Sequence, residues 1–218
     1  MALPIVMPAN NVQTAEELNI EFPGRVATLL APGGWKSKPR DVPFALDNGR
    51  FSVWSRGKQW KAGDFRKHLD EAAEVGYDPL WVVVPDVVQD GPRTLEEWCR
   101  WYDRLKPYGW NLALAVQQGI TPDIVKKLDN QPDVIFIGGG NTIWKWRYAR
   151  QWCEEFRRVH IGAVGTERRL WMAQRCGAES SDSNVWRPIG QHLNRLRKYL
   201  RQSEEMGNSE MSKGFGLM

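Results

Sequence analysis

Short apolar runs recur along the chain, and longer amphipathic segments separate them. Nearly continuous apolar runs of this length are typical of parallel strands that are buried on both faces. We predict an additional first strand at Ile5-Val6-Met7. The other predicted strands are residues 26–32, 42–47, 79–85, 111–117, 133–138, 159–164 and 179–182.

The segments between the runs carry helix signals. Residues 64–75 have one apolar face. A second helix is expected at residues 94–105, where Thr94 and Glu97 have the spacing of a capping box. Pro122 in Thr121-Pro122-Asp123 is the first residue of a third helix. The remaining predicted helices are residues 146–158, 167–176 with Gly177 as a C-cap, and 190–202.

Alternating strands and helices predict a single-domain, parallel α/β protein. The repeat of roughly 20–30 residues favours a closed (β/α)8 TIM-like barrel over an open doubly wound sheet, which is the alternative. The barrel is expected to comprise residues 1–202. Residues 203–218 are rich in Ser, Gly and Met, and we expect a disordered tail there.

Several polar residues and glycines follow the predicted strands directly. Active sites of (β/α)8 barrels lie at the carboxyl ends of the strands, so these groups are expected to meet at one opening. They are Asp47, Asp86, Gln117, Gly138-Gly139-Gly140, Gly165 and Asp182.

Composition narrows the possible functions. No stretch approaches the roughly 20 apolar residues of a membrane span, and no signal peptide precedes the first strand, so we expect a cytoplasmic protein without a membrane partner. The 3 cysteines and 3 histidines are scattered, which predicts no metal site. The net charge of +4 is mild, but several of the 12 tryptophans adjoin basic residues. Cations with interleaved rings suit a nucleic acid, although core packing is the ordinary role of tryptophan.

Asp47 and Asp182 could flank a scissile glycosidic bond. One carboxylate would trap the positive charge that develops on the sugar carbon, and the other would manage the proton of the leaving group. The alternative is that Asp47 caps a turn and Asp182 caps a helix. Asp86 and Gln117 could read the edge of a base, or they could be a loop cap and a surface amide.

The glycine run at residues 138–140 lets the backbone approach a ligand closely. Neither this run nor Gly162 to Gly165 forms a dinucleotide-binding fingerprint, so no cofactor is expected.

Five segments, taken in chain order, resemble motifs of the tRNA-guanine transglycosylase superfamily. The likeness is strongest to its compact DpdA-like members, which insert 7-deazaguanines into DNA. The five segments are Asp47-Asn48-Gly49-Arg50-Phe51-Ser52, Pro85-Asp86, Val116-Gln117-Gln118-Gly119, Ile137-Gly138-Gly139, and Val164-Gly165-Thr166 leading to Asp182.

The resemblance implies a (β/α)8 barrel that exchanges a nucleobase by breaking its N-glycosidic bond. It implies that Asp182 is the nucleophile and that Asp47 is the acid/base residue. Phe51 would stack on the base. The implied base-reading residues are Asp86, Gln117, Gly138 and Gly139.

The chain departs from the family pattern at several positions. The family's zinc site, three cysteines and a histidine after the nucleophile, is missing, which favours DNA over tRNA as the substrate. Arg50 and Gln118 stand where the family has glycines, and Ser183 stands where a cysteine often does. These changes leave the identity of the bound base open.

The sequence therefore predicts an enzyme that cleaves the glycosidic bond of a base in nucleic acid. A free 7-deazaguanine could replace the base, or water could complete an excision as in a DNA glycosylase. Arg50, Lys145 and Arg187 are the candidate nucleic-acid contacts, although a solvated lysine is the commoner case at the start of a helix. The rival predictions are a non-catalytic nucleic-acid-binding barrel and a hydrolase of a soluble nucleoside or sugar.

Overall fold

The computed structural model describes residues 3–138, 142–187 and 191–214, with side chains up to residue 207. Within these residues, 8 parallel strands pair in the order β1-β8-β7-β6-β5-β4-β3-β2. The strands are β1 (Ile5–Pro8), β2 (Thr28–Leu30), β3 (Phe44–Leu46), β4 (Val82–Val83), β5 (Leu112–Val116), β6 (Val134–Ile137), β7 (Val159–Ile161) and β8 (Ser180–Ser183).

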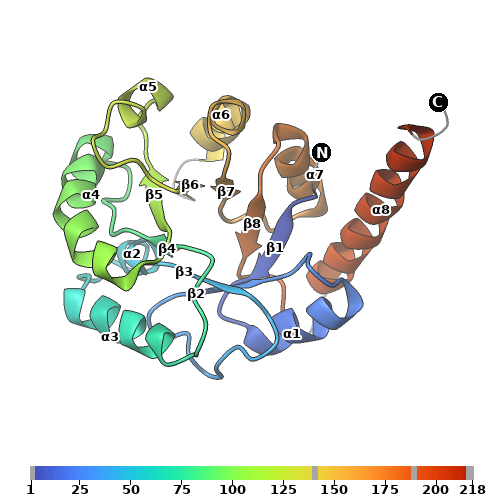
Figure 1. The fold of residues 1–218 in the computed structure, drawn as a ribbon, viewed down its shortest axis with the longest axis horizontal. Helices are drawn as coiled ribbons and strands as arrows, with labels where there is room; N and C mark the ends of the chain where they lie inside the picture. Colours follow the sequence, from blue (N-terminus) through green and yellow to red (C-terminus); the bar gives the residue numbers. More distant parts are fainter. Residues whose placement is uncertain (1–2, 139–141, 188–190, 215–218) are drawn as a thin grey trace.

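The sheet closes on itself between β1 and β2. Isolated parallel bridges join Val6 to Val26 and Ala9 to Leu29. Figure 1 shows the strands in the centre of the molecule with the helices around them. The predicted single-domain (β/α)8 barrel is therefore confirmed, and the open-sheet alternative is excluded.

Most helices cover the outside of the barrel. The helices are α1 (Val12–Glu21), α2 (Arg50–Trp54), α3 (Ala62–Ala73), α4 (Gly91–Leu105), the 3₁₀ helix η1 (Lys106–Tyr108), α5 (Pro122–Val125), α6 (Thr142–Glu155), α7 (Glu167–Cys176) and α8 (Gln191–Gly214). Side-chain oxygens of Asn11, Asp90, Thr121 and Thr166 cap the first turns of α1, α4, α5 and α7.

The core has two layers because side chains alternate across each strand. One large cluster lies between the strands and the surrounding helices. A smaller cluster, which includes Met7, Leu29, Trp81 and Val83, fills the barrel interior. The barrel is therefore solid, and a ligand can reach only its ends.

Helix α4 begins three residues before the predicted start. Asp90 is its N-cap and accepts a hydrogen bond from the backbone N–H of Arg93. The expected capping box is wrong: the hydroxyl of Thr94 bonds to the backbone of Val87 and Asp90, and Glu97 pairs with Arg50 and Arg100.

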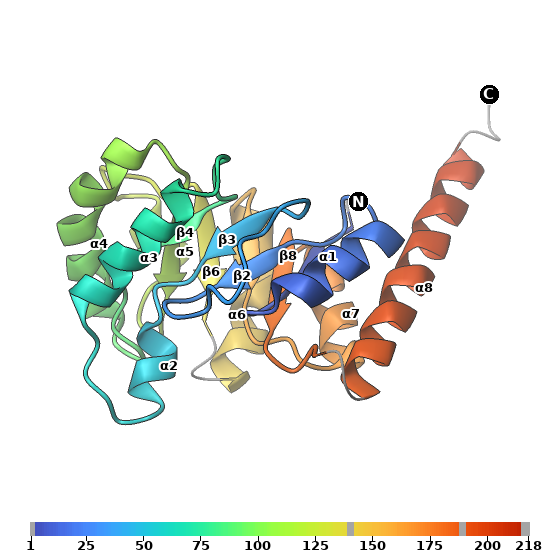
Figure 2. The same cartoon turned by 90° about the horizontal axis from the view of Figure 1, so that it is seen from below.

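The strict alternation of strand and helix fails between β2 and β3. A loop at residues 31–43 makes this connection. Its Trp35 packs edge-on against Phe44 and donates a hydrogen bond to His68. The Trp35 side chain therefore covers β3 at a place where a helix covers the other strands. The extra helix α2 follows β3 and lies at one end of the barrel (Figure 2).

Helix α8 continues to Gly214, beyond the predicted end of the barrel domain at residue 202. Ser203 is fully buried, donates to the carbonyl of Leu200 and accepts from the guanidinium of Arg25. This contact with the barrel holds the helix where the sequence suggested a disordered tail; residues 215–218 lie outside the described residues. In the described part of the chain no helix has the length and apolar character needed to cross a membrane.

Candidate active site

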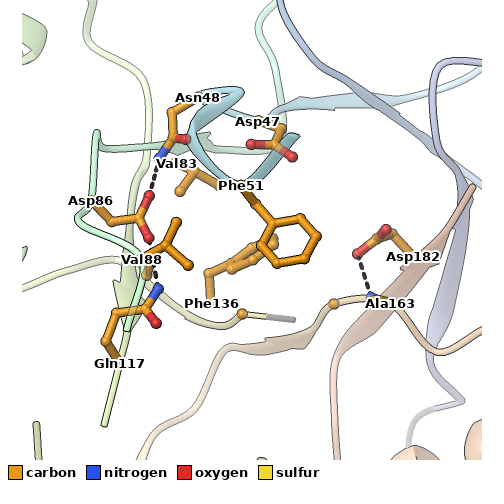
Figure 3. A pocket seen from close by; sticks show the side chains of 13 residues that line it. Asp47, Asn48, Phe51, Val83, Asp86, Val88, Gln117, Phe136, Ala163 and Asp182 are labelled. Carbon is orange, nitrogen blue, oxygen red and sulfur yellow. Dashed lines mark hydrogen bonds between the residues drawn. The ribbon is translucent and has the colours of Figure 1, made fainter. Parts of the chain in front are cut away.

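A cavity of about 80 Å³ opens at the carboxyl ends of the strands. Figure 3 shows Asp86 and Asp182 on opposite sides of this cavity, with the rings of Phe51 and Phe136 between them. The sequence placed six of the lining residues in one site, and they do meet here: Asp47, Phe51, Asp86, Gln117, Gly138 and Asp182. The predicted base-reading residue Gly139 lies outside the described residues.

Asp182 lies in β8 with only 9% of its surface exposed. Its Oδ1 accepts two hydrogen bonds, from His160 Nε2 at 3.0 Å and from the backbone N–H of Ala163 at 3.2 Å. In the described part of the chain no donor reaches its Oδ2. One oxygen is thus held in place by the protein, and the other is available to a ligand in the cavity.

Ala163 adopts a φ of 55°, which is unfavourable for a residue with a Cβ atom. The conformation directs its N–H at Asp182 Oδ1. Backbone strain of this kind costs about 1–3 kcal/mol and persists where the surroundings enforce it. It marks the loop after β7 as part of the site.

His160 connects Asp182 to the barrel interior. It lies in β7, is fully buried, and stacks on Phe136 with a centroid separation of 4.8 Å. An ionised carboxylate only accepts hydrogen bonds, so the bond to Asp182 assigns a proton to Nε2. On the other side of the ring, Nδ1 lies 2.8 Å from the hydroxyl of Ser180. His160 therefore fixes the direction of the Asp182 carboxylate.

Asp47 follows β3 directly. Its Oδ1 accepts from the backbone N–H of Gly49 at 2.9 Å, within the turn that leads into α2. Burial, reinforced by the negative charges of Asp182 and Asp86, raises the pKa of Asp47 to about 7. Asp47 can consequently hold a proton at neutral pH and donate it to a leaving group.

Asp86 is fixed through both of its oxygens. Asn48 donates to Oδ1 at 2.9 Å and Gln117 donates to Oδ2 at 2.6 Å. Burial raises the pKa of Asp86, whereas these two hydrogen bonds act in the opposite direction. A carboxylate has about four acceptor positions, so two remain for donors on a ligand.

The two amides that hold Asp86 are themselves oriented by backbone groups. The N–H of Gln89 donates to Gln117 Oε1 at 3.1 Å, and the N–H of Arg50 donates to Asn48 Oδ1 at 2.8 Å. Gln117 is therefore a positioning residue for Asp86 as well as a lining residue. The sequence did not indicate that role for Asn48.

The three predicted nucleic-acid contacts lie in different surroundings. Arg50 forms an ion pair with Glu97 at 2.8 Å and stacks on the ring of Trp60, so it supports α2. Lys145 is 2% exposed and donates to the carbonyl of Gly162, and burial lowers its pKa to about 8. Lys145 is therefore buried rather than on the surface, where a phosphate contact was expected, and Arg50 is only partly exposed, with 22% of its side chain accessible. Arg187 is exposed, and its side chain donates to the carbonyl of Asn184.

Three residues of this site, His160, Ala163 and Phe136, were not singled out by the sequence. The available signal for His160 was its central position in a strand with apolar flanks, which requires a buried partner for its ring nitrogens. Ala163 and Phe136 carry no comparable signal, because backbone conformation and ring stacking depend on the folded barrel.

In the described ranges, no three His, Cys, Asp or Glu side chains are arranged to hold a metal ion. The polar groups of the cavity are three carboxylates with their hydrogen-bond partners, which suits acid/base and nucleophilic chemistry on a neutral or cationic centre. No protein-family model matches this chain, and no curated protein matches it.

Proposed function

We propose that this protein is an enzyme that cleaves the N-glycosidic bond of a nucleobase in DNA. The observation that carries the proposal is that two carboxylates of the same cavity, Asp182 and Asp47, have different chemical environments. Asp182 has one oxygen anchored and one free, as a nucleophile needs, and Asp47 has a pKa raised to about 7, as a general acid needs.

In the first half-reaction Asp182 Oδ2 attacks the anomeric carbon of the sugar. A carbon–oxygen bond forms while the carbon–nitrogen bond to the base breaks, and the electron pair of that bond stays on the base nitrogen. Asp47 gives its proton to this nitrogen, which leaves a free base and a glycosyl ester on Asp182.

The opposite side of the cavity supports recognition of the base. The two acceptor positions left on Asp86 match the adjacent N–H donors on the edge of a guanine-like base. Phe51 is 42% exposed, and its ring occupies the space between Asp86 and Asp182 (Figure 3). A cavity of about 80 Å³ is small for a base, so the Phe51 ring has to move outward, where it can stack on the bound base.

The glycosyl ester has two possible fates that share this machinery. If a free 7-deazaguanine enters, its ring nitrogen attacks the anomeric carbon and gives its proton to Asp47, the carbon–oxygen bond to Asp182 breaks with its electron pair returning to the carboxylate, and the base is exchanged. If water enters, it attacks the same carbon and gives its proton to Asp47, the ester bond to Asp182 breaks in the same way, and an abasic site remains. A base inside a duplex is out of reach of the cavity, so the substrate is single-stranded or the base is flipped out.

The proposal is tested by mass spectrometry of the free bases that the protein releases from modified DNA, from unmodified DNA and from free nucleosides. The measurement is made with and without added 7-deazaguanine. Release that requires the deazaguanine indicates exchange, and release without it indicates excision. Absence of release from every DNA, with binding intact, would leave the non-catalytic barrel as the function. Release only from free nucleosides would indicate a soluble-nucleoside hydrolase.

Replacement of His160 tests the anchoring of the nucleophile. His160→Phe keeps the ring that stacks on Phe136 but removes the donor to Asp182, so base release should slow about 10- to 100-fold, the cost of one hydrogen bond to a charged group. DNA affinity should not change, and His160→Gln, which retains a donor, should recover part of the rate. A His160→Phe variant with the wild-type rate would show that the contact is only structural.

A further inference from the structure

A groove of about 490 Å³ lies beside the cavity, on the same end of the barrel. It is formed by the residues that follow β1, β2 and β8 and by helix α2. We call it the basic groove, because three of the described residues that line it are cationic and none of them is acidic. It is lined by Ala9, Asn10, Asn11, Ala31, Pro32, Gly33, Gly34, Lys36, Ser52, Arg56, Asn184 and Arg187.

The three cations of the basic groove are exposed and available to a ligand. Within the described residues the side chain of Arg56 bonds only to Ser52, and the side chain of Arg187 bonds only to the carbonyl of Asn184. Among the described residues neither arginine forms an ion pair, nor does Lys36. Elsewhere many surface cations are paired, such as Arg197 with Glu21. A cluster of unpaired cations attracts an anion.

A neighbouring groove shows that this charge pattern is local. It shares Arg56 with the basic groove, but its other charged residues are of both signs: Lys61, Asp64, Lys67 and Glu71. Lys67 and Glu71 are an i, i+4 pair on α3 with their charged atoms 3.9 Å apart. Positive charge without acidic neighbours is therefore a property of the basic groove and not of the whole rim.

The basic groove lies on the nucleophile's side of the site. Asn184 and Arg187 follow Asp182 along the chain after β8, whereas Asp86 and Gln117 lie on the far side of the cavity. In a nucleic acid the phosphates are attached to the sugar, on the side away from the base. A free nucleoside would place nothing in the groove, but a polynucleotide would place its backbone there.

We infer that the basic groove, through Lys36, Arg56 and Arg187, binds the phosphodiester backbone that flanks the target nucleotide of a single-stranded DNA. This inference rests on the proposed function for the identity of the ligand. Lys36 and Arg56 are specificity-determining residues in this sense, since they favour polymeric DNA over a free nucleoside. Phosphate contacts of this kind give affinity that falls with salt.

The test is fluorescence anisotropy of a labelled single-stranded 12-mer DNA bound to the full chain over a range of salt concentrations. The groove variant is Lys36→Gln/Arg56→Gln/Arg187→Gln. The matched control is Lys61→Gln/Arg66→Gln/Lys67→Gln, which removes the same charge from three exposed residues. Lys61 directly precedes α3, and Arg66 and Lys67 lie within it. Thermal unfolding of each variant checks that it is folded, and Arg187→Gln alone serves as a milder groove variant.

Three lost phosphate contacts should reduce the slope of log affinity against log salt by about 2, since each contributes about 0.7 for a single strand. Affinity near physiological salt should fall about 10- to 100-fold in the groove variant and stay within about 3-fold in the control. The inference would be overturned if both variants lost DNA affinity equally. It would also be overturned if the groove variant lost affinity for anionic phosphatidylserine vesicles as strongly as it lost affinity for DNA.

The result is separable from that of the proposed function. If the wild type releases no base but the groove variant loses DNA affinity, the function fails and the groove assignment stands. If the wild type releases bases and the groove variant binds the 12-mer and releases bases from it normally, the groove assignment fails and the function stands.

Discussion

Asp182→Asn should abolish base release, with a fall of about 10⁴-fold or more, and leave DNA binding within a few-fold of the wild type. Asparagine has nearly the same shape, and its oxygen can still accept from His160 and from the backbone of Ala163. The substitution removes the negative charge and the nucleophilic oxygen, so the glycosyl ester cannot form. Asp182→Ala should have the same effect on release.

The covalent ester gives a second measurement for this prediction. Wild-type protein mixed with DNA, without a replacement base, should yield a protein–DNA adduct that survives denaturing electrophoresis, and the Asp182→Asn variant should yield none. Asp123→Asn removes an acidic side chain from the first turn of α5 and serves as a control with full activity. Base release by Asp182→Asn at the wild-type rate would rule out Asp182 as the nucleophile.

The barrel and the meeting of the three carboxylates could be predicted from the sequence for one physical reason. Parallel strands in a closed barrel all present their carboxyl ends at the same rim. Asp47, Asp86 and Asp182 each lie at or near the end of a short apolar or buried run, so predicting the strands also predicted the site. Strand positions are strongly encoded because each run must be buried on both faces.

Local patterns were less informative where tertiary contacts decide the structure. Helix α2 has 5 residues and no buried side chain, so it has no apolar periodicity to detect. The loop that replaces a helix between β2 and β3 depends on Trp35 reaching His68, 33 positions along the chain. The continuation of α8 depends on Ser203 meeting Arg25, which no pattern within α8 records.

The environments of charged residues also depend on the fold. Lys145 was expected to be a solvated lysine near the start of a helix, yet its side chain is buried and donates to Gly162. Arg50 follows the turn at Asp47 and was a candidate nucleic-acid contact, yet it pairs with Glu97 of a different helix. Residue type suggests which chemistry is possible, whereas the partners across the barrel determine which side chains remain free for a ligand.

Asp47→Asn should have opposite effects on catalysis and on stability. An amide cannot give a proton to the leaving base, so release should slow about 10²- to 10⁴-fold. In the wild type, release should decline as the pH rises above about 7, because Asp47 loses its proton there. The variant should lack this decline, since its remaining activity does not depend on a proton at this position.

The stability effect follows from the sign of the same pKa shift. The folded-state pKa of Asp47 is raised from 3.8 to about 7, so the folded protein binds this proton more tightly than the unfolded chain does. As the pH rises from 3.8 past 7, Asp47 ionises and the free energy of unfolding falls, by on the order of a few kcal/mol at pH 8. Below pH 3.8 both the folded and the unfolded state are protonated, and this contribution is not lost. Asp47→Asn removes the cost, so its free energy of unfolding should exceed that of the wild type at pH 8, with the gain shrinking as the pH is lowered towards 4.

Urea unfolding at pH 8 and at pH 4 measures this difference. The exposed Asp41→Asn is the control, and it is expected to change the free energy of unfolding by no more than about 0.5 kcal/mol. An Asp47→Asn variant less stable than the wild type at pH 8 would mean that the carboxylate is held by compensating contacts, and the assignment of Asp47 as the general acid would lose its physical basis.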